Sequence, residues 1–254
     1  YLSKGTPLLE ELYLGRNRLL RGDIKGFQAL SRLKLRVFSL RKTRVHGDLT
    51  GLLGLLKHLR ELDFFETQVE GDVATLSGCT DLESLRINRT KVAGDFEGLS
   101  TLVKLKELDL HESHVGGELG ALSGLTNLGV LWLKEHNCRG DIADLSNLTN
   151  LTKLKLPMCP EVHGNLVAFS RFIKLQELSL QYTQVRGSVE SLVGCYNLRE
   201  VCLTGRQIQG DIAAFSALAK LTSLFLEGTQ VLGYDVVDEN RSRAAAALGG
   251  RSAK

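Results

Sequence analysis

His111, Glu112 and His114 lie close together in the sequence and are of the types that bind metals or transfer protons. Zinc proteases place two histidines four residues apart on one face of a helix, whereas His111 and His114 are three apart. The segment that carries them alternates polar and apolar residues, and alternation sends neighbouring side chains to opposite faces. The spacing therefore predicts no zinc site at this position.

The rest of the sequence offers no stronger catalytic grouping. It contains no phosphate-binding loop, no Cys-x-x-Cys pair and no serine elbow, and its six histidines are scattered. No two carboxylates occur in a context that would form a pocket. The sequence therefore predicts a protein that is not an enzyme, with no catalytic residues, no cofactor and no metal site.

A glycine recurs ten times at intervals of 23 to 25 residues, usually two residues after a branched aliphatic. The recurring positions are Gly22, Gly47, Gly71, Gly94, Gly117, Gly140, Gly164, Gly187, Gly210 and Gly233. Between them each unit reads approximately L-x-x-L-x-L-x-x-T-x-V-x-G-D-I, as in LESLRINRTKVAGDF. A fixed period of this length is typical of solenoid proteins.

The L-x-x-L-x-L core resembles the leucine-rich repeat family, and the period most resembles its plant-type class. That class usually has Asn where this chain mostly has Thr, and G-x-I-P where it has G-D-I; the wording also resembles repeat arrays of algae and protists. The resemblance implies an α/β fold: a curved, right-handed solenoid with a parallel β-sheet on the concave face. Short helices, 3₁₀ turns or loops are expected on the convex face.

We expect residues 1–234 to form about ten repeats and residues 235–254 to form a helical cap or a flexible basic tail. In each repeat the Thr hydroxyl, as at Thr67, should satisfy backbone groups where the chain leaves the strand. Asp follows the glycine in six repeats, as at Asp72, and should cap a short helix or 3₁₀ turn. The alternative for these aspartates is an acidic ladder that binds cations.

Composition gives limited information about the cellular compartment. No apolar run reaches the 18 residues of a membrane span, so direct membrane insertion is not expected. Cys79, Cys138, Cys159 and Cys195 fall on core-facing positions and Cys202 on an exposed strand position. An odd cysteine count without terminal pairs favours a reducing, intracellular environment. Four N-x-S/T sequons, at Asn88, Asn147, Asn150 and Asn240, favour the opposite. The chain begins at Tyr1, so any targeting segment is expected to lie outside it.

The outward strand positions are where the repeats differ from one another. With strands about 4.8 Å apart they form a strip roughly 40 Å long, sufficient for an interface of about 800 Å² per partner. The candidate partner-binding residues on it are Phe65, Arg86, Asp109, His111, Trp132, Lys134 and Lys155. Trp132 is expected to be exposed beside two lysines, a combination common at binding hot spots. The alternative is that these aromatics only shield the sheet.

We predict a protein–protein interaction scaffold that binds a protein partner on the concave face. The alternative is a receptor-ectodomain-like segment that recognises a carbohydrate or a small extracellular ligand. Nucleic-acid binding is not expected, because Asp63, Glu107, Asp109 and Glu177 interrupt the basic residues of the face. The sequence identifies neither the partner nor the oligomeric state.

Overall fold

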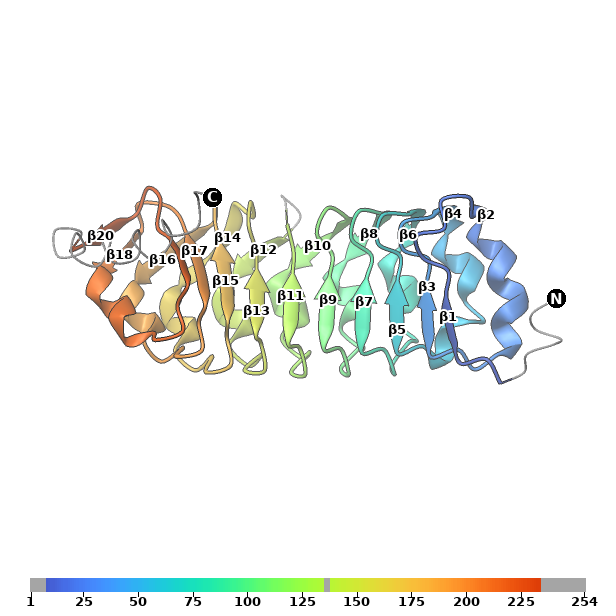
Figure 1. The fold of residues 1–254 in the computed structure, drawn as a ribbon, viewed down its shortest axis with the longest axis horizontal. Helices are drawn as coiled ribbons and strands as arrows, with labels where there is room; N and C mark the ends of the chain where they lie inside the picture. The colour runs from blue at the N-terminus through green and yellow to red at the C-terminus, as the bar shows by residue number, and fades with distance from the viewer. Residues whose placement is uncertain (1–7, 135–137, 234–254) are drawn as a thin grey trace, which may run out of the picture.

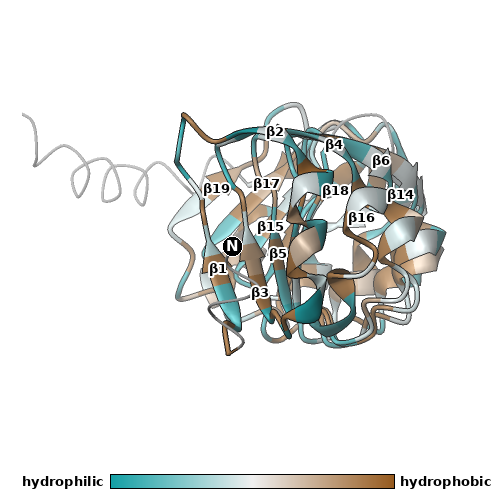
Figure 2. Cartoon of the chain, turned by 90° about the vertical axis from the view of Figure 1, so that its right-hand side faces the viewer, coloured by the Kyte–Doolittle hydropathy of each residue, from teal (hydrophilic) through white to brown (hydrophobic). Residues whose placement is uncertain are grey.

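The computed structural model describes residues 8–134 and 138–233, which form a solenoid of stacked repeats (Figure 1). Each repeat contributes one strand to a front sheet and one strand to a second sheet, and in the first nine repeats one or two 3₁₀ helices return the chain to the front. Both sheets have ten strands, and all strand pairs are parallel. Viewed from the N-terminal end, the front sheet and the helices lie on different sides and the second sheet joins them along the top (Figure 2).

The front sheet has the order β1-β3-β5-β7-β9-β11-β13-β15-β17-β19. Its strands are β1 (Glu11–Tyr13), β3 (Val37–Ser39), β5 (Glu61–Asp63), β7 (Ser84–Arg86), β9 (Glu107–Asp109), β11 (Val130–Trp132), β13 (Lys153–Lys155), β15 (Glu177–Leu180), β17 (Glu200–Leu203) and β19 (Ser223–Phe225). Equivalent residues of successive repeats pair, as Leu62 pairs with Leu85. The predicted parallel sheet is therefore confirmed.

The second sheet was not expected from the sequence. Its strands are β2 (Arg21–Asp23), β4 (Arg44–Asp48), β6 (Gln68–Asp72), β8 (Lys91–Asp95), β10 (His114–Glu118), β12 (Cys138–Asp141), β14 (Glu161–Asn165), β16 (Gln184–Ser188), β18 (Ile208–Asp211) and β20 (Gln230–Leu232). All of them except β20 contain a recurring glycine, and glycine is a poor strand former, so alternation gave no signal for them.

The 3₁₀ helices complete each turn of the solenoid. They are η1 (Ile24–Arg32), η2 (Leu49–Leu52), η3 (Leu56–His58), η4 (Val73–Leu76), η5 (Phe96–Leu99), η6 (Leu119–Leu122), η7 (Ile142–Leu145), η8 (Leu166–Phe169), η9 (Val189–Leu192) and η10 (Ile212–Ala217). The leucines of the repeat core, such as Leu62, Leu85 and Leu108, are fully buried. One hydrophobic core runs through all the repeats, because each repeat buries its apolar face against its neighbours.

The turn hydroxyls bond as predicted. Thr67 Oγ1 donates to the carbonyl of Phe64 at 2.8 Å, three residues back, at the end of the front strand. Thr43, Thr90, Ser113, Thr183 and Thr229 make the same bond. The residue just before the hydroxyl is in the left-handed region, as Glu66 is with a φ of 57°, and the strand of the second sheet begins directly after the hydroxyl residue. The hydroxyl therefore satisfies a carbonyl that the sheet leaves free.

The glycine and the aspartate of G-D-I join neighbouring repeats. Gly71 has a φ of 109°, and a Cβ at this position would lie 2.8 Å from a carboxylate oxygen of Asp48 in the preceding repeat. Asp48 itself accepts from the amide of Thr50 at 2.8 Å and caps η2. Asp23, Asp72, Asp95, Asp141, Asn165 and Asp211 cap their 3₁₀ helices in the same way. The capping prediction is confirmed, and the glycine leaves room for the cap.

The predictions for the cysteines are partly wrong. Cys138 and Cys159 form a disulfide bond, which the sequence did not suggest. Cys202 was expected to be exposed, but it is only 6% exposed, and its Sγ lies 3.8 Å from Glu200 Oε1. Burial raises the pKa of the thiols of Cys79, Cys195 and Cys202 to about 11.

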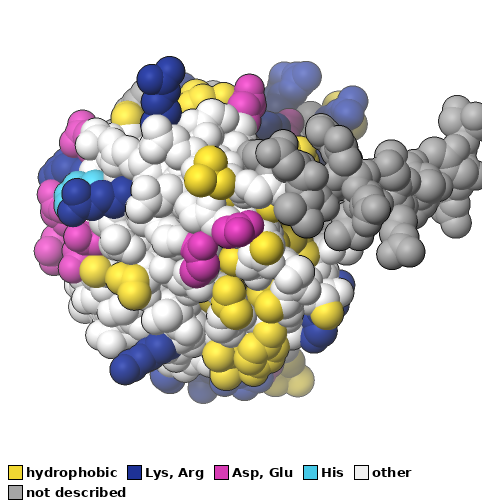
Figure 3. All heavy atoms as spheres, turned by 90° about the vertical axis from the view of Figure 1, so that its left-hand side faces the viewer, with side chains coloured by type: hydrophobic (Ala, Val, Ile, Leu, Met, Phe, Trp, Pro, Cys, Tyr) yellow, Lys and Arg dark blue, Asp and Glu magenta, His cyan; other side chains and the backbone are white. Residues whose placement is uncertain are grey.

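The last described repeat has no neighbour beyond it among the residues that the structure describes. Leu224 and Leu226 are only partly buried there, and hydrophobic side chains gather on this end of the stack (Figure 3). Residues 235–254, for which a cap helix or a basic tail is predicted, lie outside the described residues. Within the described ranges, no helix has the length and apolar character that crossing a bilayer would require.

Candidate functional site

Four of the seven predicted site residues form one row across the front sheet. Arg86, Asp109, Trp132 and Lys155 end the strands β7, β9, β11 and β13, and each is the Cα partner of the next. His111 and Lys134 lie two residues after Asp109 and Trp132 in the chain. The register of the parallel sheet therefore brings these six residues together, as the repeat pattern predicted.

Two of them are not exposed, contrary to the prediction for the outward strand positions. Asp109 is 9% exposed and His111 is 7% exposed, whereas Arg86, Trp132 and Lys155 are half-buried. Strands about 4.8 Å apart allow long side chains of adjacent repeats to cover shorter ones. The prediction of exposure is wrong for Asp109 and His111. These two residues lie beneath the longer side chains that form the surface.

His111 is the centre of a buried polar chain. Its Nδ1 lies 2.5 Å from Asp109 Oδ1, and its Nε2 lies 3.3 Å from Asn88 Nδ2. A carboxylate only accepts, so Nδ1 carries the hydrogen and Nε2 accepts from the Asn88 amide. Asp–His pairs can activate a nucleophile, but here an amide occupies the position that a hydroxyl or thiol would need. The geometry thus orients His111 without making it a catalytic base.

Trp132 stacks on this histidine. The ring centroids are 4.0 Å apart with an interplanar angle of 21°, and Lys155 Nζ lies 5.6 Å from the Trp132 ring centroid. The indole Nε1 is buried and has no hydrogen-bond partner in the described part of the chain. A shallow pocket of 280 Å³ opens beside the ring, lined by Glu107, Asp109, Val130, Leu131, Trp132, Lys153, Lys155 and Glu177. It combines an aromatic wall with charges of both signs.

The charged side chains around the pocket are paired. Arg86 Nε donates to Glu107 Oε1 at 2.7 Å and Nη1 to Glu61 Oε1 at 3.2 Å, and the bonds to Glu107 raise the pKa of Arg86. Lys153 and Lys155 both lie 2.6 Å from Glu177. Burial favours a higher pKa for Glu177, but the two lysines outweigh it and the pKa is lowered.

Lys134 belongs to a second group of charges at the edge of the sheet. Its Nζ lies 3.1 Å from Glu112 Oε1, and Arg89 Nε lies 2.8 Å from Glu112 Oε2. These two hydrogen bonds lower the pKa of Glu112. Lys134 therefore faces a carboxylate of the neighbouring repeat, and His114 of the H-E-S-H sequence lies in the second sheet.

Phe65 lies apart from Trp132. It is half-buried, and three cations surround its ring: Arg41, Lys42 and Arg89 lie 5.6, 5.1 and 5.9 Å from the ring centroid. Cation–π contacts of this kind hold an aromatic ring at the surface without burying it. The predicted strip thus contains two aromatic centres, one at Phe65 and one at Trp132.

Sequence reasoning missed the residues that complete the Trp132 site. Asn88 was considered as a sequon, but it is 3% exposed and bonds to His111. Glu107 and Glu177 were counted only as interruptions of a basic face, whereas they neutralise its cations. A usable signal was present in the sequence, because each carboxylate lies 21 to 24 residues from its cation, which is close to one repeat length. No group of three His, Cys, Asp or Glu in the described ranges is placed to hold a metal ion.

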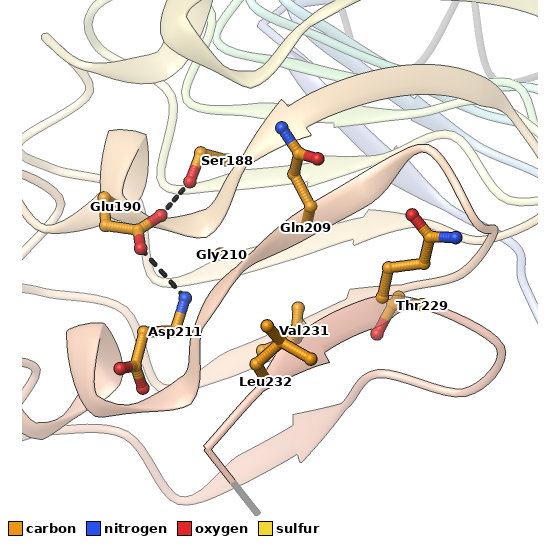
Figure 4. A pocket seen from close by; sticks show the side chains of 9 residues that line it. Ser188, Glu190, Gln209, Gly210, Asp211, Thr229, Val231 and Leu232 are labelled. Atoms are coloured by element: carbon orange, nitrogen blue, oxygen red, sulfur yellow. Dashed lines mark hydrogen bonds between the residues drawn. The ribbon is translucent and has the colours of Figure 1, made fainter.

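A larger open hollow of 750 Å³ lies at the C-terminal end of the second sheet (Figure 4). Glu190 Oε1 accepts from the backbone amide of Asp211 at 2.9 Å, and the other carboxylate oxygen accepts from the Ser188 hydroxyl. Gln209, Thr229 and Leu232 line the rest. Glu190 is the one glutamate that lines the hollow, and it is already engaged in these internal hydrogen bonds. We therefore interpret the hollow as the open end of the second sheet and not as a ligand site.

The comparisons with known proteins identify the fold. No protein-family model and no curated protein matches the sequence. Among solved structures, the chain is similar to a TDR receptor, with 22% identity over 88% of this chain and 44% of the receptor and a TM-score of 0.71. It is also similar to the ectodomain of the Arabidopsis receptor kinase HAESA, solved with an IDA peptide hormone: 22% identity, 88% and 38% coverage, and a TM-score of 0.73. An internalin, inlF of Listeria monocytogenes, gives 16% identity, 91% and 84% coverage, and a TM-score of 0.50.

These neighbours have leucine-rich repeat folds, and the predicted solenoid is confirmed on that basis together with the parallel sheets. The chain spans less than half the length of the two plant receptor ectodomains. At these identities the likeness concerns the fold.

Proposed function

We propose that this chain, a leucine-rich repeat protein, is a non-enzymatic scaffold that binds a protein partner through the front sheet. The observation that carries the proposal is the pocket beside Trp132, where a half-exposed indole stands among paired charges of both signs. Trp and Arg dominate the energy of protein interfaces, and polar surroundings set the orientation of the partner.

The geometry favours an extended polypeptide segment as the part of the partner that is bound. From Phe65 to Lys155 the strip crosses from β5 to β13, about 20 Å at the usual strand spacing and about the length of six extended residues. One apolar side chain can enter at Trp132 and another can contact Phe65. The HAESA ectodomain named above was solved in complex with a peptide hormone, which is a property of that protein that fits this proposal.

A carbohydrate ligand is the weaker alternative. Sugars stack on an open aromatic face, but His111 stacks on the Trp132 ring and Lys155 also lies over it. The charged groups that could bond hydroxyls are already engaged with one another. Both features favour a partner that contributes an apolar side chain.

The test is selection of peptides from a displayed random library on the intact chain, followed by measurement of each peptide against variants. We expect Trp132→Ala to weaken binding at least about tenfold, the usual loss for a hot-spot tryptophan. Phe65→Ala should weaken it less, because Phe65 lies at the end of the strip. Tyr196→Ala removes an aromatic that is 52% exposed outside the strip and is the matched control.

The variants must retain the circular dichroism spectrum and melting temperature of the parent chain. Equal peptide binding by the parent, Trp132→Ala and Phe65→Ala would overturn the proposal. An array of glycans run in parallel would favour the alternative if a glycan bound and Trp132→Ala abolished that binding.

A further inference from the structure

Four arginines in the first two repeats have no charge partner within the described residues. Arg16, Arg18, Arg21 and Arg44 are exposed, and their guanidinium groups make no ion pair or hydrogen bond to residues 8–134 or 138–233. They lie where the chain passes from the front sheet to the second sheet. We call this group the arginine edge.

Other cations near this edge are paired, including Arg41 and Lys42 of the second repeat. Lys42 Nζ lies 3.7 Å from Glu66, and Arg41 Nε lies 3.8 Å from Asp63. Two repeats further on, Arg89 pairs with Glu112 at 2.8 Å. Lys91, Arg186 and Arg206 of later repeats also make no ion pair in the described ranges, so the arginine edge differs by gathering four unpaired arginines in two adjacent repeats.

The sequence explains why unpaired arginines gather there. Residues 12–22 and 37–47, which cross the edge in the first two repeats, contain six cations and no carboxylate, and residues 1–7 also contain none. Residues 8–65 carry 12 Lys and Arg against 6 Asp and Glu, whereas residues 66–233 carry 15 against 20. The positive charge is thus concentrated at one end of the stack.

The backbone holds these arginines close together. Arg21 and Arg44 are Cα partners in the β2–β4 pair, and like charges directly opposite one another destabilise a sheet. The amide of Arg16 donates to the carbonyl of Arg41 at 2.7 Å, which fixes the first turn against the second. In Figure 2 β2 and β4 run side by side along this edge of the N-terminal end. An anionic partner would relieve the repulsion.

Apolar side chains border the charges. Leu19, between Arg18 and Leu20, is 89% exposed, and Tyr13 at the end of β1 is 61% exposed. Between the front strand and the recurring glycine, the first repeat has one more residue than the second. Leu20 and Val45 both lie two residues before their glycines and point toward the core, and Leu19 lies outside that position. A purely polyanionic ligand such as a nucleic acid would bind through its phosphates and would not require contact with an exposed leucine.

We infer that the arginine edge binds an acidic polypeptide segment that carries apolar side chains among its carboxylates. Guanidinium groups bind carboxylates in a bidentate manner, and Leu19 and Tyr13 supply the apolar contact. This surface lies apart from the Trp132 pocket, so it would add a second binding region to the proposed scaffold.

The experiment measures the fluorescence anisotropy of a labelled peptide of alternating Glu and Leu on the intact chain, at near-physiological salt. The double variant R18E/R44E should weaken binding at least about tenfold, because it removes two charge-assisted contacts and adds repulsion. The double variant R186E/R206E makes the same charge change at two exposed arginines of later repeats and should leave affinity nearly unchanged. Trp132→Ala should also leave it unchanged, which separates this surface from the strip.

A second variant distinguishes an acidic polypeptide from a general polyanion. Leu19→Ser should weaken the Glu–Leu peptide severalfold and leave a polyglutamate of equal length unaffected. The inference is overturned if the Glu–Leu peptide does not bind, or if both double variants lose affinity equally. It is also overturned if a single-stranded oligonucleotide or a heparin fragment binds more tightly than the peptide and Leu19→Ser changes nothing.

Discussion

The second sheet and the front sheet are built by the same ten repeats but use their positions differently. In the second sheet the glycine returns in every described repeat, and most repeats follow it with an Asp or Asn that caps the next 3₁₀ helix. In the front sheet the outward position is Arg86 in one repeat, Asp109 in the next and Trp132 in the third.

The difference follows from what each position touches. Gly71 packs against the carboxylate of Asp48 in the preceding repeat, so a change in one repeat strains another. An outward side chain of the front sheet contacts its neighbours through flexible ends, which can be exchanged as long as charges remain paired. Positions that keep the same residue type from repeat to repeat are therefore those that join neighbouring repeats. Positions that vary lie on the surface, where the residue type can change to suit a binding partner.

Replacing a recurring glycine should have the largest effect. Gly71→Ala introduces a Cβ at 2.8 Å from Asp48 and forces alanine to a φ of 109°, so we expect a loss of about 2–4 kcal/mol in the free energy of unfolding. Gly78→Ala is the control, because nothing lies within 4 Å of its added Cβ. Urea unfolding followed by circular dichroism compares the two. Equal urea midpoints for Gly71→Ala and Gly78→Ala would contradict the idea that the recurring glycine is fixed by its contact with the preceding repeat.

The turn hydroxyl should come next. Thr67→Val keeps the shape of a side chain that is 1% exposed but leaves the Phe64 carbonyl without its donor, so we expect a loss of about 1–3 kcal/mol. Thr101→Val also removes a hydroxyl that donates to a backbone carbonyl, that of Ser77, but this bond is exposed and water can replace it. A loss as large for Thr101→Val as for Thr67→Val would show that burial does not set the cost.

The cap should contribute less. Asp72→Ala removes the acceptor of the Ala74 amide at 2.8 Å, which costs about 1 kcal/mol for a typical cap. Ser188→Ala tests the same position in a repeat whose serine makes no capping bond and donates to Glu190 instead. Its unfolding midpoint should therefore shift less than that of Asp72→Ala. The reverse order would indicate that the aspartate acts through something other than capping.

The predictability of the two sheets from sequence differs for the same physical reason. The L-x-x-L-x-L alternation predicts the front strands, because one face must be buried, and Thr67 and Asp72 could be assigned from their hydrogen-bonding capacity. The second sheet could not be predicted, because a strand that carries Gly71 has neither alternation nor propensity. Burial of His111 was also missed, since it depends on Trp132 one repeat away.

The Cys138–Cys159 bond shows the same limit. The two cysteines are 21 residues apart and occupy different positions of the repeat, one in the second sheet and one in the turn after a front strand. Only the stacking of adjacent repeats brings these two positions together. When each repeat is considered separately, the sequence predicts that Cys138 and Cys159 are small core residues and does not predict that they pair.

The smallest expected effect tests the front sheet's tolerance of charge. Asp63 is 3% exposed, and burial raises the pKa of its carboxyl despite the amide of Phe65 at 3.1 Å and Arg41 at 3.8 Å. A raised pKa means that the protonated form favours folding; this contribution is complete below the unfolded pKa near 3.8 and is lost as pH rises through the folded pKa. At pH 7 the ionised Asp63 therefore opposes folding slightly.

Asp63→Asn should for this reason give a small gain in unfolding free energy at pH 7 that disappears as the pH falls below about 4. The amide oxygen of asparagine can still accept from Phe65, so the gain isolates the charge. Urea midpoints of parent and variant across this pH range measure it. A loss at pH 7 would mean that the ion pair with Arg41 outweighs the cost of burial, and that the front sheet depends on its charge pairs as the second sheet depends on its glycines.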